Sequence, residues 1–151
     1  MRKNFGRKDR ISPLGELALF ARTELKTDPY GNEYVLLSGV VKDFQGFEGE
    51  IGDKTAFEAV ANHVHILDGV TAGELRQLAA LSPGLCRTLL ELLCEKYPQK
   101  EFVVYAGAVL HDSFILRFHQ RWPGEKPYYD REISTDREFL CSAANSREEK
   151  I

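Results

Sequence analysis

The sequence lacks the features that mark membrane and secreted proteins. No apolar run approaches the roughly 20 residues that a membrane-spanning helix needs. The charged start at residues 1–10 leads into no apolar stretch typical of a signal peptide. Cysteine is scarce, and Cys86, Cys94 and Cys141 are an odd set, which argues against a disulfide framework. These absences predict a cytoplasmic chain with reduced thiols and no membrane partner.

The sequence also lacks the short motifs of common enzyme and nucleotide-binding families. Neither G-x-x-x-x-G-K-[ST] nor G-x-G-x-x-G is present, and H-E-x-x-H, C-x-x-C and G-x-S-x-G are missing too. Cys86 and Cys94 fall on the apolar side of a predicted helix, where burial keeps a thiol protonated and unreactive. The sequence therefore favours a binding module over an enzyme and predicts no cofactor.

What the sequence does contain is enough apolar material for one core. At 151 residues, 43% hydrophobic and 28% charged, the chain suits a single domain of ordinary size. The formal net charge is −3, so the whole-molecule field does not favour a nucleic-acid partner. Residues 1–10 carry five basic side chains and one acidic one, a local charge of +4. We expect a flexible basic arm at 1–10, a folded domain at 11–129 and a partly disordered tail at 130–151.

The first half of the chain has the patterns of β-structure. Alternation of apolar and polar residues from Gly15, followed by turn-forming residues at 27–32, predicts a long β-hairpin over 15–43. A helix over 14–25 is the alternative. The glycine-rich stretch 44–55 predicts a loop, and a third strand is predicted over 57–67.

The second half contains clear helix signals. Thr71 and Glu74 have the spacing of a capping box, which predicts a helix start. Ser82-Pro83 predicts a second start, of a core helix that ends at Tyr97. The runs 102–110 and 113–122 predict a second hairpin, and 134–144 has weak helical character. The order β-β-β-α-α-β-β predicts an α+β single domain, with a mostly antiparallel sheet and the core helix packed on one face.

The stretch 43–53 is the most suggestive feature for function. It holds four acidic residues, no basic one, and the apolar Phe44, Phe47 and Ile51. Apolar anchors among acidic side chains suit a basic protein partner, because charge speeds encounter while the anchors supply affinity. Trp122, after the last predicted strand of the second hairpin, offers a further anchor; core packing is the alternative for Phe44 and Trp122. The predicted partner-binding residues are Phe44, Phe47, Glu48, Glu50, Asp53 and Trp122.

In size, acidity and lack of a catalytic motif, the chain is similar in kind to the immunity proteins that bacteria make against basic nuclease toxins. The likeness is one of general character, since no motif of a particular immunity family is present. It implies a small acidic protein that neutralises or regulates a basic partner such as a toxin domain. A lower-ranked hypothesis is that the arm at 1–10 contacts RNA through counterion release.

The histidines support an alternative hypothesis, a small metal-dependent enzyme. His63 and His65 form an H-x-H pair, and alternate residues of a strand project from the same face. His111 or His119, on the second predicted hairpin, would add a third ligand. Zinc or iron would be the metal, with an open position for water. The competing interpretation is a half-exposed sheet face with hydrogen-bonded imidazoles, and the strand order decides between the two.

Overall fold

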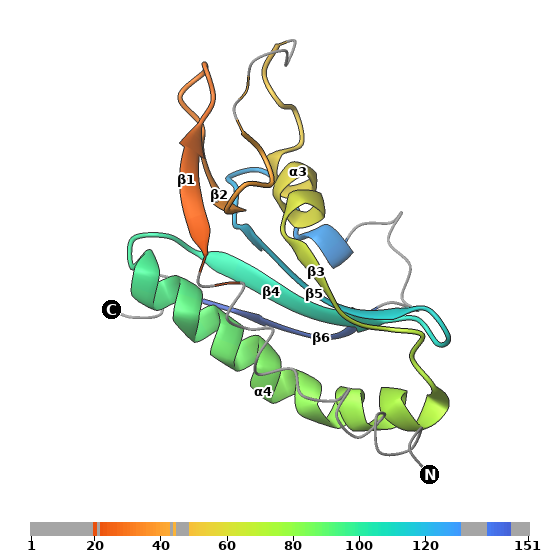
Figure 1. The fold of residues 1–151 in the computed structure, drawn as a ribbon. Helices are drawn as coiled ribbons and strands as arrows, with labels where there is room; N and C mark the ends of the chain where they lie inside the picture. Colours follow the sequence, from red (N-terminus) through yellow and green to blue (C-terminus); the bar gives the residue numbers. More distant parts are fainter. Residues whose placement is uncertain (1–19, 21, 43, 45–48, 131–138, 146–151) are drawn as a thin grey trace.

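The computed structural model describes residues 20, 22–42, 44, 49–130 and 139–145. Its strands form two antiparallel sheets. The helix α4 (Ala72–Lys96) lies on one face of the larger sheet and the helix α3 (Lys54–Ala61) on the other (Figure 1). The predicted α+β class and antiparallel sheet are therefore confirmed. The predicted basic arm at 1–10 lies outside the described residues, as do 131–138 and 146–151 of the predicted tail.

The larger sheet has four strands in the order β3-β5-β4-β6. Its centre is the hairpin of β4 (Phe102–Ala108) and β5 (Ser113–Gln120), which confirms the second predicted hairpin. β3 (His63–Asp68) pairs with β5, and β6 (Phe139–Ala144) pairs with β4. The weak helical character predicted for 134–144 is thus wrong over 139–144, because pairing with the open edge of β4 overrides the local pattern of a short segment.

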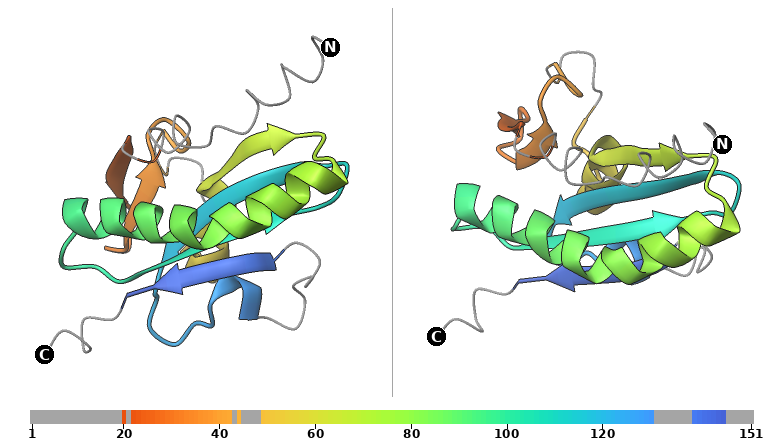
Figure 2. Two further views of the ribbon diagram at one scale, coloured as in Figure 1. Left: turned by 90° about the horizontal axis from the view of Figure 1, so that it is seen from below. Right: turned by 60° about the horizontal axis from the view of Figure 1, so that its bottom comes forward.

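One long helix covers a face of this sheet, where two helices were predicted. The helix α4 (Ala72–Lys96) runs across the sheet without a break (Figure 2). Its start confirms the capping box, since Thr71 and Glu74 bond reciprocally. The predicted second start at Ser82 is wrong: Pro83 lies inside the helix, and the Ser82 hydroxyl donates to the carbonyl of Leu78 over 2.6 Å.

The reason for this continuity is the apolar stripe of α4. A proline inside a helix costs about 3 kcal/mol, whereas each fully buried leucine contributes about 1.5–3 kcal/mol. Leucines on both sides of Pro83 share the buried stripe, so packing outweighs the local helix break. These buried residues are Leu78, Leu85, Leu89 and Leu93.

A short helix, α3 (Lys54–Ala61), replaces the predicted end of the loop and the first part of the predicted third strand. Asp53 caps it, because its carboxylate accepts from the Ala56 amide over 3.0 Å. Thr55, Glu58 and Ala59 are the buried positions, with the i, i+3, i+4 spacing of one helix face. The strand prediction for 57–61 is therefore wrong, and the chain turns into β3 only at His63.

The first predicted hairpin is present as β1 (Thr23–Thr27) and β2 (Glu33–Leu37), which form a separate two-stranded sheet. It projects beyond the larger sheet (Figure 1). The alternative helix over 14–25 is wrong for 23–25, while residues 14–19 and 21 lie outside the described part.

Strand β2 contributes to two hydrophobic cores. Val35 and Leu37 join the main core between α4 and the larger sheet. Tyr34 and Leu36, on the opposite face of β2, join a second cluster with Phe44. The partly buried members of this second cluster are Val41, Ile51, Phe57, Ala61 and Trp122.

In the described part of the chain, no helix combines the length and the apolar character required to cross a membrane.

Candidate functional site

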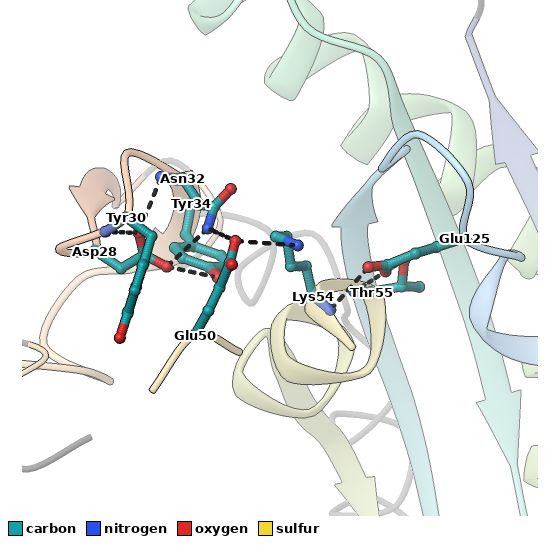
Figure 3. A network of polar contacts seen from close by, with 8 residues as sticks. All are labelled: Asp28, Tyr30, Asn32, Tyr34, Glu50, Lys54, Thr55 and Glu125. Atoms are coloured by element: carbon teal, nitrogen blue, oxygen red, sulfur yellow. Dashed lines mark hydrogen bonds and ion pairs between the residues drawn. The ribbon is translucent and has the colours of Figure 1, made fainter. Parts of the chain in front are cut away.

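The tip of the β1–β2 hairpin is held by the carboxylate of Asp28 (Figure 3). Its Oδ1 accepts from the amides of Tyr30 and Asn32, both over 2.9 Å. Its Oδ2 accepts from the Asn32 side-chain amide over 3.0 Å and from the Tyr34 hydroxyl over 3.2 Å. The turn closes at Gly31, whose φ of 88° suits glycine. A turn with this many internal hydrogen bonds has one preferred conformation.

These contacts also fix the charge of the tip. Desolvation opposes ionisation of Asp28, but hydrogen bonds from Asn32, Tyr30 and Tyr34 outweigh it and lower its pKa below the ordinary carboxyl value. The pKa of Tyr34 is raised, first by burial and then by the neighbouring negative charge of Asp28. At neutral pH the tip therefore carries an ionised Asp28 bonded to a neutral phenol.

Tyr30 is the exposed aromatic residue of this tip. The residue is 56% exposed, whereas Tyr34, four residues later, is fully buried. Exposed tyrosine on an ordered turn is common at protein-binding surfaces, because it offers a large contact area and loses little conformational entropy.

Acidic side chains from the segment before α3 lie beside the tip. Glu50 accepts from the Asn32 side-chain amide over 2.9 Å and lies 3.9 Å from the Lys54 ammonium (Figure 3). Its side chain is still 49% exposed. Asp53, the exposed cap of α3, follows on the same segment. We call this group the tip surface: Tyr30, Asn32, Glu50 and Asp53, together with the buried Asp28 that holds the turn.

Two predicted anchors lie beneath the tip surface and not on it. Phe44 is buried, with its ring centre 5.3 Å from that of Tyr34. Trp122 is half-buried, with its ring centre 5.2 Å from that of Tyr34. The structure thus places both aromatic residues in the second cluster, which supports the hairpin from below. Phe47 and Glu48 lie outside the described residues.

Below this cluster, the carboxylate of Glu58 is completely buried and accepts four N–H donors. Its Oε2 accepts from the Val35 amide over 2.9 Å, and its Oε1 accepts from the Trp122 indole over 2.8 Å. Gln120 supplies the other two donors, its amide and its side chain, both over 2.7 Å. Burial raises the pKa of Glu58 to about 7, while these hydrogen bonds act in the opposite direction.

Asn62, one turn after Glu58, completes the attachment of the hairpin. Its side chain accepts from the Leu37 amide over 2.9 Å and donates to the Val35 carbonyl over 2.8 Å. Glu58 and Asn62 therefore bond the edge of β2 that faces away from β1, in place of a neighbouring strand. This explains why the burial of polar side chains at this joint is tolerated.

A cleft of about 310 Å³ lies beside Trp122, under the loop 121–127. Glu125 lines it, and its carboxylate accepts from the Thr55 amide over 2.7 Å, from the Thr55 hydroxyl over 2.6 Å and from the Lys54 amide over 3.2 Å (Figure 3). Glu125 thus neutralises the N-terminus of α3. This part of the cleft wall holds the loop on the helix.

His119 also lines the cleft, but hydrogen bonds occupy both of its ring nitrogens. Its Nδ1 donates to the Gln120 carbonyl over 2.6 Å. Its Nε2 lies 2.9 Å from the Tyr105 hydroxyl and accepts from the Tyr128 amide over 3.2 Å. With its imidazole only 1% exposed, His119 is a structural residue that fixes the start of the 3₁₀ turn η2 (Tyr128–Asp130).

The remaining histidines lie apart from His119. His63 and His65 share a face of β3 as predicted, with ring centres 5.3 Å apart. β3 and β5 are neighbours, but the register pairs His63 with Arg117, so His119 lies beyond the start of β3. His111 is exposed in the β4–β5 turn. Within the described ranges, no group of three or more His, Cys, Asp or Glu residues is arranged to hold a metal ion.

A buried cation and a pair of thiols complete the polar interior. The Arg117 guanidinium lies 4.8 Å from the ring centre of Tyr128 and donates to the Ala59 carbonyl over 3.1 Å. The sulfur atoms of Cys86 and Cys141 lie 3.4 Å apart, which joins α4 to β6. Burial raises the pKa of the Cys86 thiol, as expected for an unreactive cysteine.

Comparisons with protein-family models, with curated proteins and with solved structures gave no significant match to this chain.

Sequence reasoning found part of the tip surface and missed part. Glu50 and Asp53 were predicted partner-binding residues, and both are exposed. For Tyr30, the sequence pattern predicts only a place in a turn. The available signal is that Asp28 and Asn32 flank Tyr30. An aspartate that accepts hydrogen bonds from the amides after it orders the turn, and the side chain between the two residues then points to solvent.

Proposed function

We propose that this chain is a protein-binding module that docks on a basic partner through the tip surface. The observation that carries the proposal is the geometry of Tyr30: its ring is largely exposed, on a turn that Asp28 holds in one conformation. A preordered aromatic anchor loses little entropy on binding, so more of its contact energy appears as affinity. Tyr30 takes the anchor role that the sequence suggested for Phe44 and Trp122.

The charge around Tyr30 favours a basic partner. The turn and the segment 49–53 carry Asp28, Glu50 and Asp53 and no basic residue. Lys54 lies 3.9 Å from Glu50, and Lys26 in β1 lies 3.8 Å from Glu24. An acidic rim around an apolar anchor speeds encounter with a positively charged protein and disfavours acidic ones.

A narrower form of the proposal is an inhibitor of a basic nuclease or toxin domain, which acts in the cytoplasm. It follows from the likeness in general character to immunity proteins and stays a prediction. A purified basic nuclease that the chain binds and inhibits would establish it.

The proposal is tested by photo-crosslinking in cells that express the chain. A benzoylphenylalanine in place of Tyr30 should crosslink a basic protein. The same group at Leu110, an exposed apolar residue in the β4–β5 turn, is the matched control. The captured protein should then bind the purified chain at least tenfold more weakly after Tyr30→Ala. Equal crosslinking from both positions, or unchanged affinity after Tyr30→Ala, would contradict the proposal.

A further inference from the structure

His63 and His65 lie on the outermost strand of the larger sheet, away from the tip surface. β3 is an edge strand, and both side chains project from the face that also carries Ile115 and Arg117 of β5. Alternate Cα atoms of a strand are about 6.6–6.8 Å apart. The two imidazole centres are 5.3 Å apart, so the rings lean toward each other.

The hydrogen bonds of the two rings determine which nitrogen is available. The Nδ1 of His63 lies 2.6 Å from the Val60 carbonyl, and the Nδ1 of His65 lies 3.1 Å from a carboxylate oxygen of Asp68. A carbonyl and an ionised carboxylate only accept hydrogen bonds, so each Nδ1 carries the proton. In each neutral ring the lone pair is therefore on Nε2.

This arrangement matches the outer contacts of metal-bound histidines. Such a histidine binds the ion through one nitrogen and donates from the other to a carboxylate or a backbone carbonyl, which fixes its tautomer and orientation. Both kinds of acceptor are present, Asp68 for His65 and the Val60 carbonyl for His63. The part of the chain that the structure describes places no hydrogen bond on either Nε2.

The ring spacing matches as well. Two imidazoles bound through nitrogens 2.0–2.1 Å from a tetrahedral ion have centres about 5 Å apart. The observed separation is 5.3 Å, with the ring planes at 58° to each other. Zinc suits neutral imidazole ligands and tetrahedral geometry. We propose that His63 and His65 chelate one zinc ion through their Nε2 atoms.

The proposed site differs from the three-histidine centre suggested by the sequence. It uses two histidines on a surface strand and leaves His119 in its structural role. The His65 side chain is 49% exposed, so water would complete the coordination. Asp68 acts as a positioning residue, because it orients His65 without binding the ion.

The first experiment is calorimetric titration of the full chain with zinc chloride, at about pH 7.5, where free imidazole is mostly neutral. We expect saturable binding of one ion per chain. His63→Asn and His65→Asn should each weaken it at least tenfold, and Asp68→Ala should weaken it by about 10- to 100-fold. His111→Asn, at an exposed histidine of the β4–β5 turn, is the matched control and should change nothing.

The second experiment measures the imidazole nitrogen resonances of the wild-type chain, so it does not depend on the folding of variants. Long-range ¹H–¹⁵N spectra should show His63 and His65 protonated at Nδ1 without zinc. Zinc should then shift the Nε2 resonances of these two residues and leave those of His111 and His119 in place. Absence of saturable uptake, uptake that survives the combined His63→Asn and His65→Asn variant, or a zinc-induced shift that is larger at Nδ1 than at Nε2 would each overturn the proposal.

Discussion

The indole of Trp122 donates to the buried carboxylate of Glu58 over 2.8 Å, which ties the loop after β5 to helix α3. Through the same carboxylate, this loop is joined to Val35 of the projecting hairpin. A single buried acid therefore connects the cleft wall, the short helix and the hairpin that carries the tip surface.

Glu58→Gln, measured at about pH 5, should destabilise the fold by about 1–3 kcal/mol, because the glutamine NH₂ turns two donors toward the N–H groups, whereas a protonated carboxyl has one donor and accepts through both oxygens. Urea unfolding followed by circular dichroism measures the change. Glu95→Gln, on the exposed side of α4, is the control and should lie within about 0.5 kcal/mol of the wild type. Equal stability of the Glu58 and Glu95 variants would show that the four hydrogen bonds contribute little.

The stability of the chain should also depend on the ionisation of Glu58. Its pKa is raised from 4.5 to about 7 in the folded state, so the folded state binds the proton more tightly than the unfolded state does. The contribution of Glu58 protonation to the free energy of unfolding is therefore complete below about pH 4.5. It is lost as the pH rises to about 7, which lowers the free energy of unfolding by about 3 kcal/mol. The advantage of the wild type over Glu58→Gln should shrink across this range. An advantage that grows with pH would show that the N–H donors outweigh burial.

Asp28→Ala should loosen the hairpin tip, since it removes the acceptor of four hydrogen bonds. We expect a loss of about 1–3 kcal/mol, together with faster hydrogen exchange at the Asn32 amide. Because the folded-state pKa of Asp28 is lowered, its contribution should persist at neutral pH and disappear only below the ordinary carboxyl pKa of 3.8. Asp112→Ala, at the exposed turn of the β4–β5 hairpin, is the matched control. Unchanged exchange at Asn32 would argue against an ordered tip.

Glu50→Lys should slow association with the proposed basic partner and reverse the salt dependence of the on-rate, because the acidic rim becomes locally neutral or positive. Surface plasmon resonance at several salt concentrations measures both effects. Glu91→Lys makes the same change of net charge on the exposed side of α4 and serves as the control. If both variants slow association equally, net charge matters and the tip surface does not.

Much of the fold was predictable where local signals agree with tertiary packing. The capping box at Thr71, the β4–β5 hairpin and the turn between β1 and β2 have strong local signatures, and all three are present. The proline at position 83 was misleading, because the stripe of buried leucines on both sides of it keeps the helix intact. Local patterns do not report that kind of packing.

The missed elements depend on distant partners. Helix α3 is stabilised at its N-terminus by Glu125, about 70 positions along the chain, and no local pattern reveals that contact. β6 forms because β4 offers an open edge. For the candidate sites, the period of a strand placed His63 and His65 on one face. The burial of Phe44 and Trp122 required knowledge of what Tyr34 packs against.

The bonds from Glu58 and Asn62 to β2 also set the alignment of the hairpin. Residues four apart in a helix are separated by about 6 Å along the axis, which is close to the spacing of alternate strand residues. Glu58 and Asn62 can therefore bond Val35 and Leu37 at the same time. A slip of β2 by one residue would exchange its two faces and send the Tyr34 ring toward the main core. The helix thereby adds a second constraint on the alignment that the Asp28 turn of the hairpin already favours.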